Sequence, residues 1–248
     1  MIYRIVVGVA FFVLFFSCKD VKKVPGSANE TTTNVEKPQV VKPQKEANQK
    51  DTIAVLDHTT IKKDVIENSD FINIEQISGD FVLDMKYATS DNFLKEKVYS
   101  CAKCYIRKNV AEALIKANKD FIKQGYKIKF FDCYRPHSVQ KKMWKIFPNP
   151  GYVADPKGGS IHNKGAAVDI TLVKLDESLV DMGTGFDHFG KEAHHAYSKH
   201  SEAVLANRKL LRETMKKHGF KTIRTEWWHY NFYAGKKYQI SNFEWECD

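Results

Sequence analysis

The feature that most limits what this chain can fold into is a long stretch without aromatic side chains. No Phe, Tyr or Trp occurs from Lys19 to Asp70, where Lys, Thr, Asn, Gln and Glu dominate. Such a segment cannot bury enough apolar surface to offset the entropy lost on ordering. Aromatic residues are frequent from Phe71 onward. We therefore predict a tether over residues 19–69 and a folded domain over residues 70–248, long enough for a hydrophobic core.

The first residues have the pattern of a secretory leader. Arg4 gives a positive start, and the twelve residues from Ile5 to Phe16 are apolar or Gly, fewer than the ~20 that span a bilayer. The run ends at Ser17-Cys18. This end resembles a bacterial lipoprotein processing site, which predicts a signal peptide over residues 1–18 with Cys18 as the lipidated residue. Cleavage elsewhere and an uncleaved anchor are the alternatives.

All three possibilities export the rest of the chain. The lipidated form would be a membrane-tethered lipoprotein, in the periplasm or at the cell surface. Export also makes disulfides the favoured state of the four remaining cysteines, because such compartments are oxidising. Three pairings are possible, and Cys101 and Cys104 could instead form half of a zinc knuckle, although no second CxxC or HxxxH follows. The four residues are Cys101, Cys104, Cys133 and Cys247.

The basic charge does not indicate a nucleic-acid partner. The formal net charge is +9, but the lysines are scattered, with no run longer than two, which is typical of a solvated surface. No helix-turn-helix, RNA-binding or zinc-finger spacing occurs, so we expect no nucleic-acid binding. The oligomeric state is not specified by the sequence.

Helix and strand patterns alternate within the predicted domain. Val110, Leu114, Ala117 and Phe121 are spaced as one face of a helix, which Gly125 would end. A second amphipathic helix is predicted over 201–219, and a third from Pro136 to about residue 147. The mixture without a strict βαβ rhythm predicts an α+β fold. The strands are predicted over residues 81–87, 127–134, 166–173 and 222–233, the last one broken near its middle.

His162 and Asp169 form the first candidate pair for chemistry. The loop GGSIHNKG carries His162, and Asp169 lies in the strand AAVDITLV. Taken singly, each could be a solvent-exposed polar residue. The apolar neighbours of Asp169 predict that it is buried, and a buried carboxylate needs a partner.

The sequence TEWWHY supplies two more candidates, Glu226 and His229. Two histidines and one carboxylate with one open position are typical of catalytic zinc, and such a set would leave Glu226 as a base for water. Residues three apart in a regular strand point to opposite faces. The pair therefore predicts a backbone bend between Glu226 and His229.

Arg135 is the third candidate, at the end of the strand in FDCYRPHS. Pro136 restricts the backbone of Arg135 to extended conformations. A guanidinium fixed there could bind a carboxylate or a developing oxyanion. The alternative is a structural arginine that caps the helix or pairs with Asp132.

Four motifs in this order resemble one family closely. FDCYRPHSVQ, SIHNKGAAVDITL, MGTGFDHF and TEWWHY are similar to those of the zinc-dependent D-alanyl-D-alanine dipeptidases, the VanX-like family, over about residues 70–235. The resemblance implies an antiparallel sheet with packed helices, the α+β fold of zinc D,D-carboxypeptidases and hedgehog-type domains.

The same resemblance implies residue roles and one zinc ion per chain. His162, Asp169 and His229 would be the zinc ligands, Glu226 the catalytic base, and Arg135 the residue that stabilises the tetrahedral intermediate. Ser160 and Asp187 fall where the family contacts substrate. With these roles, HFGKEAHH (188–195) is interpreted as a polar loop although it looks like a metal cluster.

The implied reaction is hydrolysis of the dipeptide D-Ala-D-Ala by metal-activated water. Export would place the substrate among peptides released by cell-wall turnover, unlike cytoplasmic relatives that act in antibiotic resistance. One alternative is a zinc D,D- or L,D-carboxypeptidase acting on longer peptidoglycan stem peptides. Another is a lipoprotein that only binds wall fragments. A disulfide at Cys133 would stiffen the strand that leads to Arg135.

Overall fold

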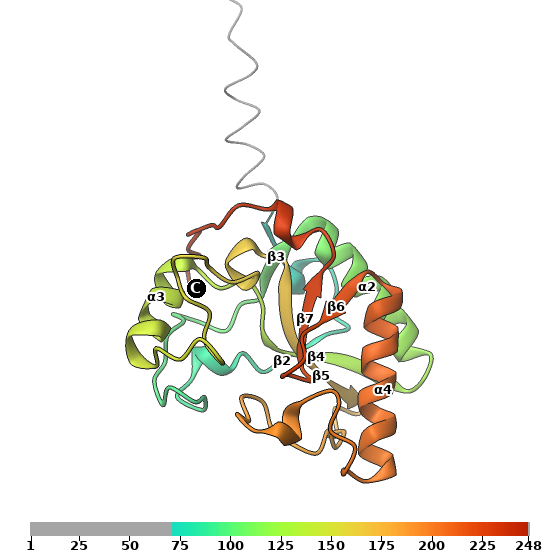
Figure 1. Ribbon diagram of the computed structural model, residues 1–248. Helices are drawn as coiled ribbons and strands as arrows, with labels where there is room; N and C mark the ends of the chain where they lie inside the picture. Colours follow the sequence, from blue (N-terminus) through green and yellow to red (C-terminus); the bar gives the residue numbers. More distant parts are fainter. Residues whose placement is uncertain (1–70, 248) are drawn as a thin grey trace, which may run out of the picture. The chain divides into compact units, whose positions relative to one another are not determined.

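A five-stranded sheet is the centre of residues 71–247, the part of the chain that the computed structural model describes (Figure 1). The predicted signal peptide and tether, residues 1–69, lie outside the described residues. All neighbours in the sheet are antiparallel except β2, which runs parallel to β4. The spatial order is β2 (Val82–Leu83), β4 (Tyr126–Asp132), β5 (Ala167–Lys174), β7 (His229–Phe232) and β6 (Phe220–Thr222).

Smaller elements complete the domain and confirm the predicted α+β class. A separate two-stranded ribbon pairs β1 (Phe71–Asn73) with β3 (Tyr105–Arg107). Five single-turn 3₁₀ helices lie in the connections. They are η1 (Ile74–Gln76), η2 (Lys86–Ala88), η3 (His162–Lys164), η4 (Lys191–Ala193) and η5 (Gly235–Lys237).

Helices α2 (Lys108–Ile122) and α4 (Glu202–Lys217) lie side by side against one face of the sheet, and α3 (His137–Ile146) lies on the other side (Figure 1). The four apolar residues predicted to form one face of α2 are completely buried, as their spacing requires. Past α2, Gly125 has a φ of +85°, a conformation that L side chains rarely adopt.

Both ends of α4 follow from the sequence. The Ser201 side chain accepts a hydrogen bond from the backbone N–H of Val204, which satisfies one of the free donors of the first turn. At the other end Gly219 adopts a φ of +88°. The predicted helix 201–219 is therefore confirmed, with its two outermost residues acting as caps.

Two predicted strands are shorter in the structure. The stretch 81–87 forms only the two residues of β2 before η2 begins. The stretch 222–233 is divided into the end of β6 and β7, and residues 223–228 between them are irregular. The break predicted in this stretch is therefore confirmed.

A β-bulge in β4 sets which side chains face the site. The register shifts between Phe130 and Asp132, so that Asp132, and not Phe131, lies opposite Asp169. Asp169 in turn lies opposite His229. Directly opposed residues of antiparallel strands point to the same face. The bulge therefore places three polar residues from three strands on one face of the sheet.

The four cysteines of the domain form two disulfides. Cys101 is bonded to Cys247, and Cys104 is bonded to Cys133. The structure thus confirms disulfides over a zinc knuckle and selects one of the three possible pairings. Within residues 71–247, no helix combines the length and the apolar character needed to cross a membrane.

Candidate active site

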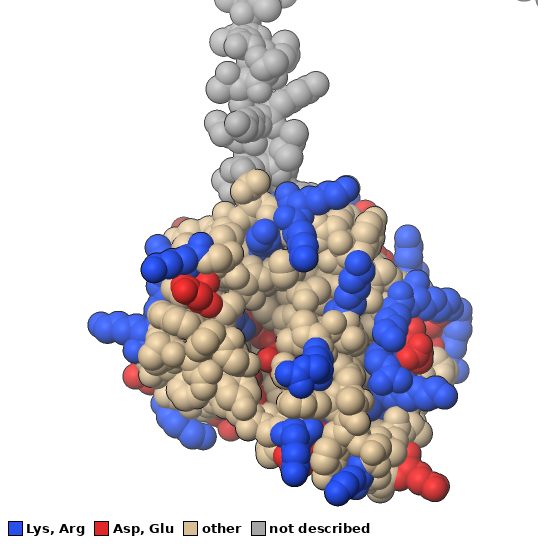
Figure 2. All heavy atoms as spheres, in the orientation of Figure 1, with Lys and Arg blue, Asp and Glu red and all other residues tan. Residues whose placement is uncertain are grey.

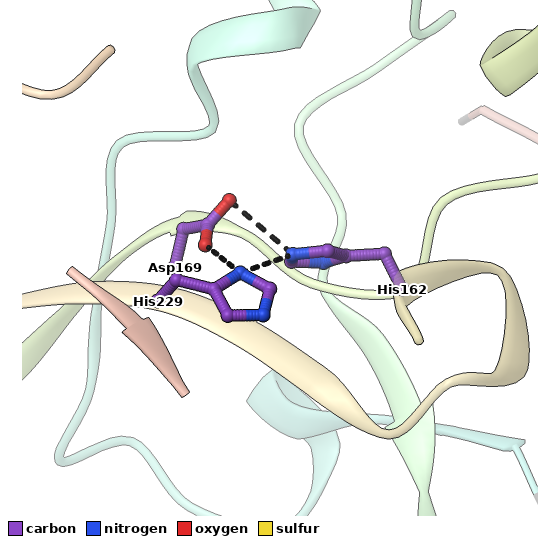
Figure 3. Close-up of side chains that lie close together, drawn as sticks. All are labelled: His162, Asp169 and His229. Carbon is purple, nitrogen blue, oxygen red and sulfur yellow. Dashed lines mark hydrogen bonds and ion pairs between the residues drawn. The ribbon is translucent and has the colours of Figure 1, made fainter. Parts of the chain in front are cut away.

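Three side chains converge at the edge of the sheet face that α2 and α4 leave uncovered. His162 comes from η3, Asp169 from β5 and His229 from the first position of β7 (Figure 3). Their ligand atoms lie within 4.8 Å of one another, and all three residues are buried. Among the described residues this is the one His, Cys, Asp and Glu group with such spacing. The alternative of solvent-exposed residues is wrong for His162 and Asp169.

The outer hydrogen bonds fix the orientation of both imidazoles. Nδ1–H of His162 donates to the carbonyl oxygen of Cys133 at 2.7 Å, which leaves Nε2 as an acceptor. Nε2–H of His229 donates to Oδ1 of Asn231 at 3.0 Å, which leaves Nδ1 as an acceptor. Outer partners of this kind are typical of metal-binding histidines.

The inner atoms are all acceptors and need a cation between them. Nε2 of His162 lies 3.2 Å from Nδ1 of His229. Oxygens of Asp169 lie 3.4 Å from the first nitrogen and 3.0 Å from the second. Two lone pairs and a carboxylate that face one another at these distances repel unless a proton or a metal ion lies among them. Two imidazoles and one carboxylate suit Zn²⁺, with a fourth position left open.

The ionisation of the group fits the same role. Burial alone would raise the pKa of Asp169, but the two imidazoles outweigh burial and hold the pKa of this carboxyl below its ordinary value. Asp169 is therefore a carboxylate at neutral pH. Burial lowers the pKa of His229, and its contact with Asp169 more than reverses this effect. A cation in the centre would take the place of the proton that Asp169 attracts.

Glu226 lies beside this group but outside it. Its Oε2 is 3.9 Å from Nδ1 of His229, and the backbone bends at Trp227 and Trp228. The bend predicted between Glu226 and His229 is therefore confirmed. Burial raises the pKa of Glu226; the imidazole of His229 opposes that effect, and the charge of Asp169 adds to it. A carboxyl with a raised pKa next to a metal-ligand cluster is suited to accept and return a proton.

Arg135 pairs with Asp132, as the structural alternative predicted. Its Nε and Nη2 donate to the carboxylate of Asp132, and its Nη1 donates to Oε1 of Gln140 at 2.9 Å. These bonds use three of the five N–H groups of Arg135, and the hydroxyl of Tyr99 also interacts with the guanidinium. Burial opposes the charge of Arg135, but Asp132 outweighs it and raises the pKa, so the guanidinium stays charged. Arg135 also lines the cavity described next.

The group of His162, Asp169 and His229 opens into a cavity of about 410 Å³. Figure 2 shows a hollow on this face of the molecule with acidic atoms inside it, while Lys and Arg are spread around its outline. The volume is at the lower end of the range for small-molecule sites. Residues from every predicted site motif line it, including Arg135, Ser160, Asp187 and Glu226.

Asp187 gives the cavity a third carboxyl group. It has a φ of +56° and accepts a hydrogen bond from the Tyr87 hydroxyl at 3.0 Å. Burial raises the pKa of Asp187 well above its ordinary value, and the charge of Asp169 adds to this. A positively charged group that entered the cavity would favour the ionised carboxylate. The cavity is therefore suited to an ammonium group.

Ser160 and Trp228 line the cavity, and Trp227 packs next to Trp228. Oγ of Ser160 accepts from the backbone N–H of His162 at 3.2 Å, so this hydroxyl lies at the turn that carries the first histidine. Trp227 and Trp228 are buried, and Nε1 of Trp227 donates to Oγ1 of Thr184 at 2.8 Å. The indole of Trp228 packs on Phe186 and lines the cavity. The tryptophans thus hold the bend between Glu226 and His229.

The histidine-rich loop 188–195 does not join the site. His188 contacts Glu192 at 3.3 Å, and neither belongs to the group with metal-binding geometry. Burial and the nearby cations Arg212 and Arg208 lower the pKa of His195 to about 4. A cationic surrounding of this kind disfavours a metal ion. Among the described residues, this loop therefore contributes no side chain to a group with metal-binding spacing.

Four residues that hold the side chains of the site in place were not identified from the sequence. Tyr87 holds Asp187, Asn231 orients His229, and Gln140 holds Arg135. Buried Asn163 donates to the carbonyl oxygen of Arg135 at 2.8 Å. Asn231 lies two residues beyond His229 and so on the same face of β7, a spacing that could have revealed it. Tyr87 lies 100 residues from Asp187 and Asn163 lies 28 residues from Arg135, so these two contacts gave no local signal. Gln140 lies only five residues after Arg135, in the same motif.

Comparison with known proteins identifies the family. A family model described as D-ala-D-ala dipeptidase matches residues 67–246. The D-alanyl-D-alanine dipeptidase of Escherichia coli is 31% identical over 181 residues, which cover 73% of this chain and 94% of that protein. The D-alanyl-D-alanine dipeptidase of Enterococcus faecium is 34% identical over 64% of this chain and 90% of its own length.

Solved structures show weaker likeness. The LD-carboxypeptidase LdcB is 20% identical, with a TM-score of 0.38 over 68% of this chain and 72% of that chain. VanYB in complex with D-alanine-D-alanine is 18% identical, with a TM-score of 0.35 over 54% of this chain and 76% of that chain. The family resemblance seen in the four motifs is confirmed by the sequence matches: the protein belongs to the D-Ala-D-Ala dipeptidase family.

Proposed function

We propose that this protein is a zinc metallopeptidase that hydrolyses the free dipeptide D-Ala-D-Ala. The proposal rests on the family and on one observation above all. The acceptor atoms of His162, Asp169 and His229 converge beside a buried carboxyl and a buried guanidinium, inside one small cavity. Zinc held by these three residues would polarise the peptide carbonyl and lower the pKa of an attacking water toward about 7.

Glu226 and Arg135 carry out the proton transfer and the stabilisation of the oxyanion. Glu226 accepts the proton of the attacking water and returns it to the nitrogen of the leaving D-alanine. An N–H group of Arg135 that is not used in the bonds to Asp132 and Gln140 donates to the oxyanion that forms on the scissile carbonyl, and the salt bridge with Asp132 keeps the guanidinium from moving. Because Asp132 is completely buried, this orientation is fixed before substrate arrives.

The two ends of the substrate need opposite partners. Asp187 and Glu226 carry the negative charge that a dipeptide ammonium requires, and binding of the ammonium would favour the ionised form of Asp187. The Ser160 hydroxyl lies at the turn before His162 and can donate to the substrate. A free amino group close to the scissile bond is a property of dipeptides that longer stem peptides lack.

We also propose that the protein is exported and anchored to a membrane by a lipid on Cys18. The leader pattern of residues 1–18 is the basis of this proposal, and the two disulfides support it because they persist in oxidising compartments. The substrate would then be D-Ala-D-Ala released by cell-wall turnover, and the role would be recycling or nutrition.

Substrate length separates this function from the carboxypeptidase alternative. We expect the protein to hydrolyse D-Ala-D-Ala with a kcat/KM at least about 10²-fold above that for a pentapeptide ending in D-Ala-D-Ala, because the acidic cavity recognises a nearby ammonium. L-Ala-L-Ala serves as the stereochemical control. Release of D-alanine is measured for the three peptides under identical conditions. Faster cleavage of the pentapeptide would favour a carboxypeptidase.

A further inference from the structure

The C-terminal strap, residues 239–247, lies against the turns that carry the site residues. After η5 it runs toward the start of α3 without regular secondary structure (Figure 1). Ser241 bonds to both turns at once: its N–H donates to the carbonyl oxygen of Asn163 at 2.8 Å, and its own carbonyl accepts from His137 N–H at 3.2 Å. One strap residue therefore joins the η3 turn to the start of α3.

The first connection leads from Ser241 to the backbone of Arg135. The Asn163 side chain donates to the carbonyl oxygen of Arg135 at 2.8 Å and accepts from the N–H of Ser160 at 2.7 Å. The backbone N–H of Arg135 donates to the carbonyl oxygen of His162 at 3.1 Å. Asn163 is completely buried, so these bonds are shielded from water. The strap thus holds the residue that locks Arg135, Ser160 and His162 together.

The second connection leads from Trp245 to the guanidinium of Arg135. The indole of Trp245 packs on the ring of Tyr99, with centroids 5.5 Å apart, and stacks on Tyr105 at 5.4 Å. The hydroxyl of Tyr99 donates to Oδ1 of Asp132 at 2.6 Å, and the other oxygen of Asp132 accepts from Arg135. The strap therefore supports both the backbone and the charged group of one arginine.

A disulfide keeps this strap in place. Cys247, two residues after Trp245, is bonded to Cys101, two residues after Tyr99. The disulfide therefore joins the strap to the segment that carries the tyrosine on which Trp245 packs. Cys247 is exposed, whereas Cys104 and Cys133 of the other disulfide are completely buried. The strap has no regular secondary structure of its own, and the disulfide fixes it at Cys247.

We propose that the strap is a positioning element for Arg135 and that the Cys101–Cys247 disulfide keeps it closed. Its kinetic consequence rests on the proposed function, in which Arg135 acts on the developing oxyanion. Opening the strap lets the guanidinium move, while Asp169 and His229 stay on the sheet and the His162 ring stays bonded to the carbonyl oxygen of Cys133. The loss then falls on kcat more than on KM or on metal content, because the oxyanion exists only in the transition state.

The test compares the wild-type chain with the double variant Cys101→Ser/Cys247→Ser. We expect kcat for D-Ala-D-Ala to fall at least about tenfold, with KM within about twofold and zinc content unchanged. Hydrogen–deuterium exchange should rise in peptides that cover residues 131–137. Trp245→Ala should reproduce both effects, and Trp245→Phe should restore most of the activity because the ring contact survives.

Each measurement has an outcome that would contradict the proposed role of the strap. Wild-type kcat and exchange in both the double variant and Trp245→Ala would mean that the strap positions nothing. A loss of zinc with a general rise in exchange would mean that the disulfide only stabilises the fold. If the wild-type chain does not hydrolyse D-Ala-D-Ala, the proposed function fails. Hydrogen–deuterium exchange over residues 131–137 then shows by itself whether the strap positions Arg135.

Discussion

Replacing Glu226 by Gln should abolish most turnover while leaving the metal in place. Glu226 lies 3.9 Å from Nδ1 of His229 and outside the group of three ligands. The amide keeps the size of the side chain but cannot accept a proton from water. General-base catalysis contributes about 10²–10⁴-fold to a rate, so we expect kcat to fall by about 10³-fold or more, with zinc close to one per chain.

The matched control for this variant is Glu213→Gln. Glu213 lies on the exposed side of α4 and pairs with Arg212. The Glu213→Gln variant should keep wild-type kcat, KM and zinc content. Turnover by Glu226→Gln near the wild-type rate would remove Glu226 from the reaction, and loss of zinc from this variant would make Glu226 a ligand instead of a base.

Replacing Asp169 by Ala should remove the metal and, with it, the activity. Asp169 supplies the one carboxylate of the group, and its oxygens lie 3.0 Å and 3.4 Å from the two ligand nitrogens. Without it, two neutral imidazoles remain, which is too few for tight zinc binding. We expect zinc affinity to drop by more than the ~10–100-fold that loss of an outer partner costs. Titration of the metal-free protein with zinc measures this change.

Asp176→Ala controls for loss of a carboxylate near the same strand. Asp176 is exposed in the turn after β5, where it accepts from the N–H of Ser178. The zinc affinity and turnover of the Asp176→Ala variant should equal those of the wild-type protein. If Asp169→Ala binds zinc with wild-type affinity, Asp169 is not a zinc ligand.

Local patterns allowed much of this architecture to be predicted. The spacing of Val110, Leu114 and Phe121 indicated α2, and glycines marked the ends of two helices, because these signals depend on neighbours in the chain. The break near Trp227 followed from chemistry: Glu226 and His229 can cooperate only if the strand is interrupted. Residue chemistry singled out the two histidines, Asp169, Glu226 and Arg135 as candidates, and the motifs of the family supplied their roles and added Ser160 and Asp187.

Features that depend on distant contacts could not be predicted. β2 is two residues long because its parallel pairing with β4 extends only over Val82 and Leu83. The bulge that turns Asp132 toward Asp169 results from pairing with β5, and the sequence of β4 alone does not predict it. The pairing of Cys101 with Cys247 spans 146 residues. Its choice among three possibilities depends on how the C-terminal strap packs, which is a property of the folded chain.

The most direct test of the central claim measures metal content and hydrolysis on the same sample. The purified wild-type protein is analysed for zinc and assayed for D-alanine release from D-Ala-D-Ala, then again after chelation and after zinc is restored. We expect about one zinc per chain, loss of turnover with the metal, and recovery when zinc returns. Full turnover by the metal-free protein, or a zinc-loaded protein that leaves D-Ala-D-Ala intact, would contradict the central claim.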